Sequence, residues 1–166
     1  MPQAFYIAFG AAFTGAVSWA LGRLLFARLK LKLYRGEEHV MAFMAGSAVL
    51  SLLVFALAAA GAVRKGLLLM LGAVILVEAF RRGGHRSRGE ALPSLPLAWR
   101  IVLGAAFALF GALYLTNAMA PEISPDGSAY HLRFVGDYHR AHGFVRITTN
   151  MYANLSQGLE LLFLFA

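Results

Sequence analysis

The stretch Met41-AFMAGSAVLSLLVFALAAAGA-Val63 carries no charged side chain and decides the class of this protein. A helix needs roughly 20 consecutive apolar residues to cross the hydrocarbon core of a bilayer. Residues 41–63 meet that length, so they predict a membrane-spanning helix.

The rest of the chain repeats this pattern. Further apolar runs cover Ala4 to Phe26, Leu67 to Phe80 and Ile101 to Ala118, and a fifth run begins at Leu159 and continues to Ala166. Only helices and closed barrels satisfy the backbone in lipid, and barrel strands alternate apolar with polar residues. These runs do not alternate. We therefore expect an all-α integral membrane protein with about five transmembrane helices, the last of them truncated.

The basic residues indicate the orientation. The formal charge is +7, but the cations gather at residues 23–35 and 81–100, beside the apolar runs. The positive-inside rule places these two loops in the cytoplasm, so the N-terminus and residues 119–157 are expected outside. This explanation leaves no role for nucleic acid as a partner; the partner is the lipid bilayer. A composition rich in Ala and Arg is typical of a bacterial inner (plasma) membrane protein.

The Gly-, Pro- and charge-rich segment 83–96 is typical of a linker. It divides a three-helix transmembrane preamble, residues 1–82, from a second unit at 97–166. Small residues spaced by four, at Ala12, Ala16 and Ala20 and at Ala108 and Ala112, predict helix-packing faces. Glu78 is expected to pair with Arg81 and Arg82.

The outer segment 119–157 contains the signals of an amphipathic helix. Ser124 is a suitable N-cap, Pro125 suits the first helical position, and Gly143 is a typical stop. The expected helix runs from Pro125 to His142 and lies on the membrane surface. At 100° per residue its two faces are Asp126, Tyr130, Arg133, Asp137 and Arg140 against His131, Leu132, Val135, Tyr138 and His142.

Several of these side chains have structural as well as chemical interpretations. Asp137 has Arg133 and Arg140 at helical spacing, as in ordinary surface ion pairs. Glu122 and Asp126 stand four apart near the membrane, where capping and solvation compete with a catalytic role. His131 and His142 are too far apart along a helix to share a metal ion, and His139 with His142 gives only a weak metal signal. A divalent metal therefore stays open, without a strong ligand set.

The segment Asp126-Gly-Ser-Ala-Tyr-His-Leu132, followed by an amphipathic helix that ends in His142-Gly-Phe144, resembles the first outer loop of the GT-C superfamily of membrane glycosyltransferases. This family includes bacterial aminoarabinose transferases and protein mannosyltransferases. The resemblance covers roughly Leu97 to Ala166. The preamble has no counterpart in the usual plan of the family, whose later helices are missing from this chain, so the fragment alone is expected to be inactive.

The resemblance implies an inverting transfer of a sugar from a polyprenyl-phosphate donor to an acceptor on the outer face. It implies an acidic residue as the base, with Asp126 the first choice and Glu122 the second. The departing lipid phosphate would need cationic side chains or hydrogen-bond donors. Substrate-binding candidates are Arg133, His131, Arg146 and Tyr130, with Gln157, Glu160, Asn150 and Asn154 behind them. The alternative hypothesis is a non-catalytic membrane subunit or a transporter fragment. The sequence leaves the sugar, the acceptor and the oligomeric state open.

Overall fold

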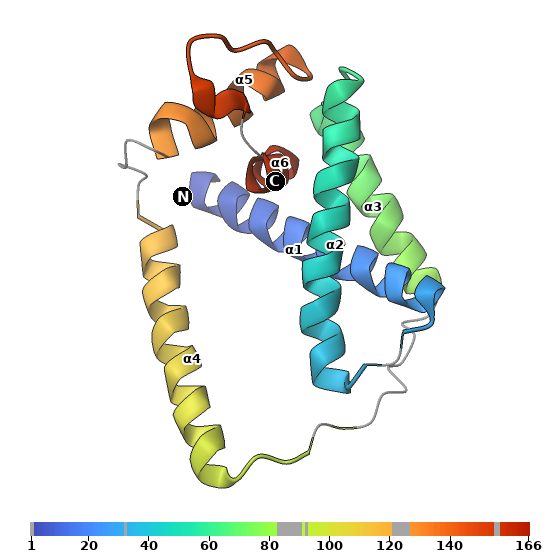
Figure 1. Cartoon of the computed structure of the whole chain (residues 1–166), viewed down its shortest axis with the longest axis vertical. Coiled ribbons are helices and arrows are strands. Elements are labelled where there is room, and N and C mark those ends of the chain that lie inside the picture. The colour runs from blue at the N-terminus through green and yellow to red at the C-terminus, as the bar shows by residue number, and fades with distance from the viewer. Residues whose placement is uncertain (1, 32, 83–90, 92, 121–126, 155–156) are drawn as a thin grey trace.

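The computed structural model describes residues 2–31, 33–82, 91, 93–120, 127–154 and 157–166, and every regular element in these residues is helical (Figure 1). The elements are α1 (Pro2–Leu29), α2 (Arg35–Ala59), α3 (Lys65–Arg81), α4 (Leu97–Ala118), the π-helical turn η1 (Gly127–His131), α5 (Leu132–Ala141), the 3-10 turn η2 (Met151–Asn154) and α6 (Gly158–Phe165). The predicted all-α class is confirmed for this part of the chain.

Within the described residues, three helices are long and apolar enough to cross a membrane. They are Ala4–Leu29 of α1, Gly36–Ala59 of α2 and all of α4, Leu97–Ala118. Helix α3 has 17 residues, or about 25 Å, which is short of a hydrocarbon core of about 30 Å. Four complete spans and the beginning of a fifth therefore remain a prediction.

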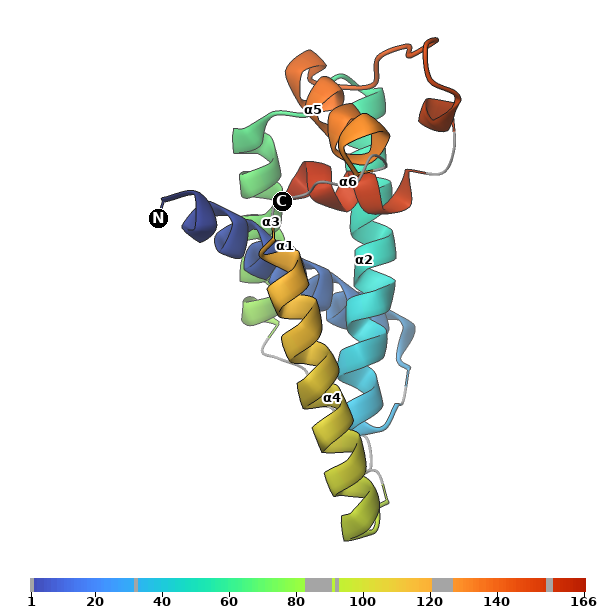
Figure 2. The same ribbon diagram turned by 90° about the vertical axis from the view of Figure 1, so that its left-hand side faces the viewer.

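Helices α1 and α2 cross obliquely and approach each other very closely (Figures 1 and 2). A methyl group added at Gly22 would overlap the carbonyl oxygen of Ala42, and one added at Gly46 would overlap that of Ser18. Each helix thus presents two small residues four apart, Ser18 with Gly22 and Ala42 with Gly46. Small residues at this spacing let helix backbones meet in lipid.

The packing faces predicted from alanine spacing are therefore wrong in detail. Ala20 is buried, but Ala12, Ala16, Ala108 and Ala112 are exposed. The contact between α1 and α2 instead follows the glycines, because only a residue without a side chain permits this approach.

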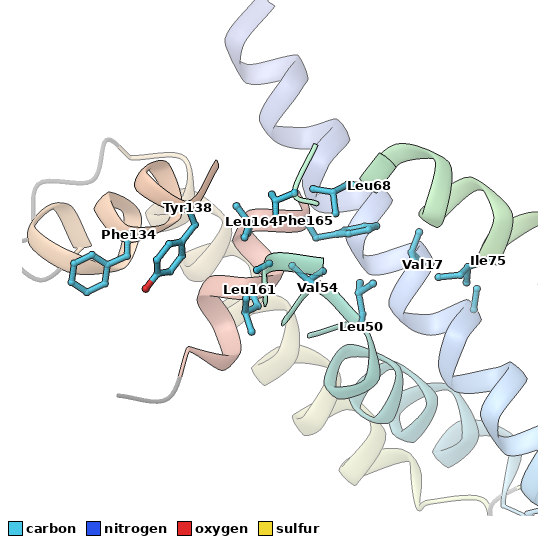
Figure 3. Packing of buried hydrophobic residues seen from close by; sticks show 13 residues of the cluster. Val17, Leu50, Val54, Leu68, Ile75, Phe134, Tyr138, Leu161, Leu164 and Phe165 are labelled. Atoms are coloured by element: carbon cyan, nitrogen blue, oxygen red, sulfur yellow. The ribbon is translucent and has the colours of Figure 1, made fainter. Parts of the chain in front are cut away.

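The short helix α6 lies across α2 and closes the core beneath α5 (Figure 2). The Ser51 hydroxyl of α2 donates to the Gly158 carbonyl at 2.9 Å, and the ring of Phe165 stacks on that of Phe13 with 5.7 Å between centroids. The buried side chains of this core come from α1, α2, α3, α5 and α6 and from Val63 in the turn between α2 and α3 (Figure 3). Residues more than a hundred positions apart thus share one hydrophobic cluster.

Helix α4 stands apart from this body (Figure 1). None of its residues is buried. Its apolar surface is therefore available to lipid or to other helices along its whole length.

Candidate functional site

The candidate site lies in the segment that follows α4. Within the predicted helix from Pro125 to His142, residues 127–141 are helical and form two parts, the π-helical turn η1 and α5. Glu122, Ser124, Pro125 and Asp126 lie outside the described residues, so the predicted cap and the two predicted catalytic carboxylates stay predictions.

The C-terminal end of α5 differs from the expectation. The left-handed residue is His142, with φ 59°, and not Gly143; the Gly143 N–H donates to the Tyr138 carbonyl at 3.0 Å, which closes the helix. Glycine is required at position 143 for a different reason: a Cβ atom at this position would lie 2.6 Å from the Ala58 carbonyl oxygen. The predicted stop was therefore wrong by one residue.

This tight turn attaches the segment to the end of α2. The Val63 N–H donates to the His142 carbonyl at 2.8 Å, and the Phe144 N–H donates to the Ala58 carbonyl at 3.2 Å. The His142 imidazole adds a bond from Nδ1 to the Val63 carbonyl at 3.0 Å. His142 is thus a structural link between α5 and the α2–α3 turn.

The predicted faces of the helix also need correction. The buried stripe is Tyr130, Phe134 and Tyr138, which repeat every four residues: Phe134 and Tyr138 are buried and Tyr130 is half-buried against them, whereas Leu132 is exposed. Tyr130 was expected on the polar face. The four-residue spacing of the aromatic residues was visible in the sequence and would have placed Tyr130 on the buried face. The assumption of 100° per residue fails here because Tyr130 lies in a π-helical turn, whose hydrogen bonds span five residues and not four.

A hydrogen-bonded pair forms beside this stripe. His131 Nδ1 lies 2.5 Å from the Glu160 carboxylate, although 29 residues separate the two. Glu160 is only 6% exposed and stands in the first turn of α6, where the helix dipole favours a carboxylate. A buried carboxylate is unfavourable unless it is paired, so His131, the last residue of η1, and Glu160 join the start of α5 to α6. Both were candidates from the sequence, but their contact was not predicted.

Aromatic rings cover one side of this pair. Tyr130 stacks on Tyr152 of η2, with 4.6 Å between centroids, and lies 4.3 Å from the His131 ring. The Asn150 side-chain oxygen accepts from the Tyr152 N–H at 3.0 Å and holds this turn in place. Tyr152 was not among the candidates. We call His131, Glu160, Tyr130 and Tyr152 the His–Glu site.

The buried acid also affects its neighbour Tyr138. Burial raises the pKa of the Tyr138 phenol above its ordinary value of 10.0, and the negative charges of Asp137 and Glu160 raise it further. The phenol therefore ionises only at a higher pH than an exposed tyrosine does.

The remaining candidates lie around the site or away from it. Gln157, half-buried, donates from Nε2 to the Tyr152 carbonyl at 3.4 Å. Arg133 and Arg146 are exposed, and Asn154 is the last residue of η2.

Asp137 and Glu78 each pair with one of the two arginines that the sequence predicts for them. Arg140 donates to Asp137 at 2.5 Å and Arg82 donates to Glu78 at 2.6 Å. These two acids therefore have structural partners, as expected.

Among the described residues, no group of three or more His, Cys, Asp or Glu side chains is placed to hold a metal ion. The described part of the site instead combines an imidazole, a buried carboxylate and stacked aromatic rings. Such groups can donate a proton or a hydrogen bond to a substrate and can pack against a sugar ring. Comparison with protein-family models, curated proteins and solved structures gives no match, so a functional assignment depends on the residues themselves.

Proposed function

We propose that this chain is part of a GT-C-like membrane glycosyltransferase that transfers a sugar from a polyprenyl-phosphate donor to an acceptor on the outer face of a bacterial inner membrane. In this proposal the protein has five spans and an outside N-terminus, and α5 lies at the interface. The observation that carries the proposal is the His–Glu site. It joins three of the residues that the family resemblance selects, Tyr130, His131 and Glu160.

The proposed roles follow from the chemistry of glycosyl transfer. The acceptor hydroxyl must lose its proton as its oxygen attacks the anomeric carbon, and Asp126, directly before η1, is the proposed base. The bond to the lipid phosphate breaks at the same time, and the leaving phosphate needs hydrogen-bond donors. His131, donating from Nδ1 to Glu160, can present Nε2–H to that phosphate.

Glu160 is a positioning residue in this scheme. Its carboxylate holds the imidazole in one orientation, as a carboxylate does for the histidine of a catalytic triad. The stacked rings of Tyr130 and Tyr152 offer an apolar face on which a sugar ring can pack.

The arrangement of the helix ends supports the proposal. Residues 142–144 bond to the α2–α3 turn at residues 58–63, whereas the basic ends of α1 and α3 lie at the opposite end of the body (Figure 1). The positive-inside rule assigns the outer segment and the α2–α3 turn to the same side. Their contact satisfies that requirement.

The decisive experiment measures sugar transfer from a polyprenyl-phosphate donor in membranes that contain the full-length protein. We expect Asp126→Asn to lower kcat by about 10²-fold or more, because the base is lost. His131→Asn should lower kcat about 10²-fold with little change in KM, as when a donor to the developing charge is removed. Glu160→Gln should have a smaller effect than His131→Asn.

The matched control is Asp137→Asn, since Asp137 has the same charge as Asp126 but pairs with Arg140. It should retain near wild-type transfer. If Glu122→Gln abolishes transfer and Asp126→Asn does not, then the base is Glu122. Survival of activity in both variants would overturn the catalytic assignment.

A second candidate function is a non-catalytic membrane subunit, and α4 favours it. An apolar helix without a buried residue is suited to packing against helices of another membrane protein. In that case His131 and Glu160 serve only to attach α5 to α6. Their variants would then lower stability, and a complex purified through this chain would retain its activity when Asp126 is replaced.

A further inference from the structure

A cavity of about 350 Å³ lies between the C-terminal halves of α1 and α3, and none of its lining residues belongs to the His–Glu site. Its volume falls at the lower end of the range for small-molecule sites. The walls include Trp19, Arg23 and Leu24 from α1 and Leu76, Phe80 and Arg82 from α3. No role in the proposed transfer requires this α1–α3 cavity.

The lining divides into an apolar part and a basic part. Leu24, Leu76 and Phe80 provide hydrocarbon surface, and Phe80 is 85% exposed, so the apolar wall continues onto the outside of the helix bundle. Arg82 is the C-cap of α3. Arg23 lies over the ring of Trp19, with 4.9 Å from its guanidinium carbon to the ring centroid. Arg23 lies six residues before the end of α1 at Leu29, and a long basic side chain at such a position can reach toward the lipid headgroups.

Cations outnumber acids at this end of the body, and this excess favours an anion although both cavity arginines have carboxylate neighbours. Arg23 is 3.8 Å from Glu38 and Arg82 is 2.6 Å from Glu78, so each guanidinium has a carboxylate neighbour. Arg82 uses Nε for its pair, and a guanidinium has further N–H groups for a phosphate. Arg28, Lys30 and Arg81 stand at the same helix ends without equal numbers of acids, which leaves this end of the body positive.

We propose that the α1–α3 cavity binds an anionic phospholipid of the leaflet that faces the basic loops. The phosphate lies against Arg23 and Arg82, and an acyl chain follows the apolar wall past Leu76 and Phe80. A basic pocket between helices on this side of a membrane is suited to such a headgroup. Free phosphate would not use the apolar wall, and an apolar peptide would not use the arginines.

Tryptophan fluorescence gives a direct test, because the chain has two Trp residues and only Trp19 lines the cavity. A Trp99→Phe protein is reconstituted into phosphatidylcholine nanodiscs that contain increasing fractions of brominated phosphatidylglycerol or brominated phosphatidylcholine. We expect quenching of Trp19 by the anionic lipid to saturate at a low fraction, with about fivefold preference over phosphatidylcholine. Phosphatidylglycerol without bromine should reverse this quenching by competition, and inorganic phosphate should not.

Three variants define the site. Arg82→Gln should abolish most of the preference, whereas Arg81→Gln, which removes the same charge one residue earlier, should retain it. Ala79 also lines the cavity, so Ala79→Phe should fill it and prevent saturable quenching, with unchanged helical content by circular dichroism. Equal quenching by both lipids in the Trp99→Phe protein would overturn the proposal. Equal losses in Arg81→Gln and Arg82→Gln would also overturn it, because they would indicate a general surface charge effect.

Discussion

Helices α2 and α4 are both apolar and long enough to cross a membrane, yet they have opposite environments. Helix α2 contacts α1 and α6, and its buried residues include Ala42, Leu50 and Val54. Helix α4 has no buried residue. Both contain small residues at suitable spacing, so composition does not explain the difference. The difference is that α2 has a partner helix, α1, with small residues at the point of contact. Ser18 and Gly22 of α1 lie opposite Ala42 and Gly46 of α2.

The largest expected effect breaks this comparison directly. Gly46→Leu places a side chain against the Ser18 carbonyl, so α1 and α2 must separate, and we expect a loss of about 3 kcal/mol in unfolding free energy. The matched change in α4 is Gly111→Leu, where an added Cβ meets nothing within 4 Å. It should change stability by less than about 0.5 kcal/mol.

Unfolding in mixed micelles, followed by circular dichroism, measures both variants. Equal losses would mean that α4 is as tightly packed as α2, contrary to the structure.

A smaller effect is expected where α5 attaches to the end of α2. His142→Ala removes the bond to the Val63 carbonyl and leaves Ala in a left-handed conformation, so it should cost about 2 kcal/mol in total. His142→Gly removes the same bond but adopts φ 59° without strain, so it should cost about 1 kcal/mol less than His142→Ala.

The exposed His139 serves as the control, and His139→Ala should change little. Identical losses of unfolding free energy in His142→Ala and His142→Gly, measured by the same assay, would contradict the expected strain of alanine in the left-handed conformation.

The smallest effect concerns the pH dependence of the α5–α6 contact. Because the pKa of Tyr138 is raised in the folded protein, the unfolded phenol ionises first as the pH rises above 10.0. The folded state then holds more protons, so its stability falls with increasing pH, and the contribution of this residue is fully present below the unfolded pKa.

Unfolding free energies measured from about pH 9 to about pH 11, around the ordinary phenol pKa, test this prediction. We expect a shallower decline in Tyr138→Phe than in the wild type. An identical slope in the two proteins would show that Tyr138 does not titrate with folding.

Several features of the fold and of the candidate segment were predictable because they depend on local sequence. The ion pairs of Glu78 with Arg82 and of Asp137 with Arg140 follow from three- and four-residue spacing on a helix, and both are present. The aromatic stripe through Phe134 was equally local, but counting every residue at 100° misplaced Tyr130. The contact between His131 and Glu160 had no local signal, since it depends on how α6 lies on α5.

By itself, the sequence determined the helical class, the apolar lengths of α1, α2 and α4, and the concentration of cations beside them. These properties arise from backbone hydrogen bonding and from side-chain polarity, which act along a continuous stretch of chain. Only the tertiary structure decided which glycines lie at a helix contact, why His142 and not Gly143 adopts the left-handed conformation, and which acid His131 meets. Each of these depends on a carbonyl or carboxylate from a distant segment, and the position of that group is fixed only when the helices pack.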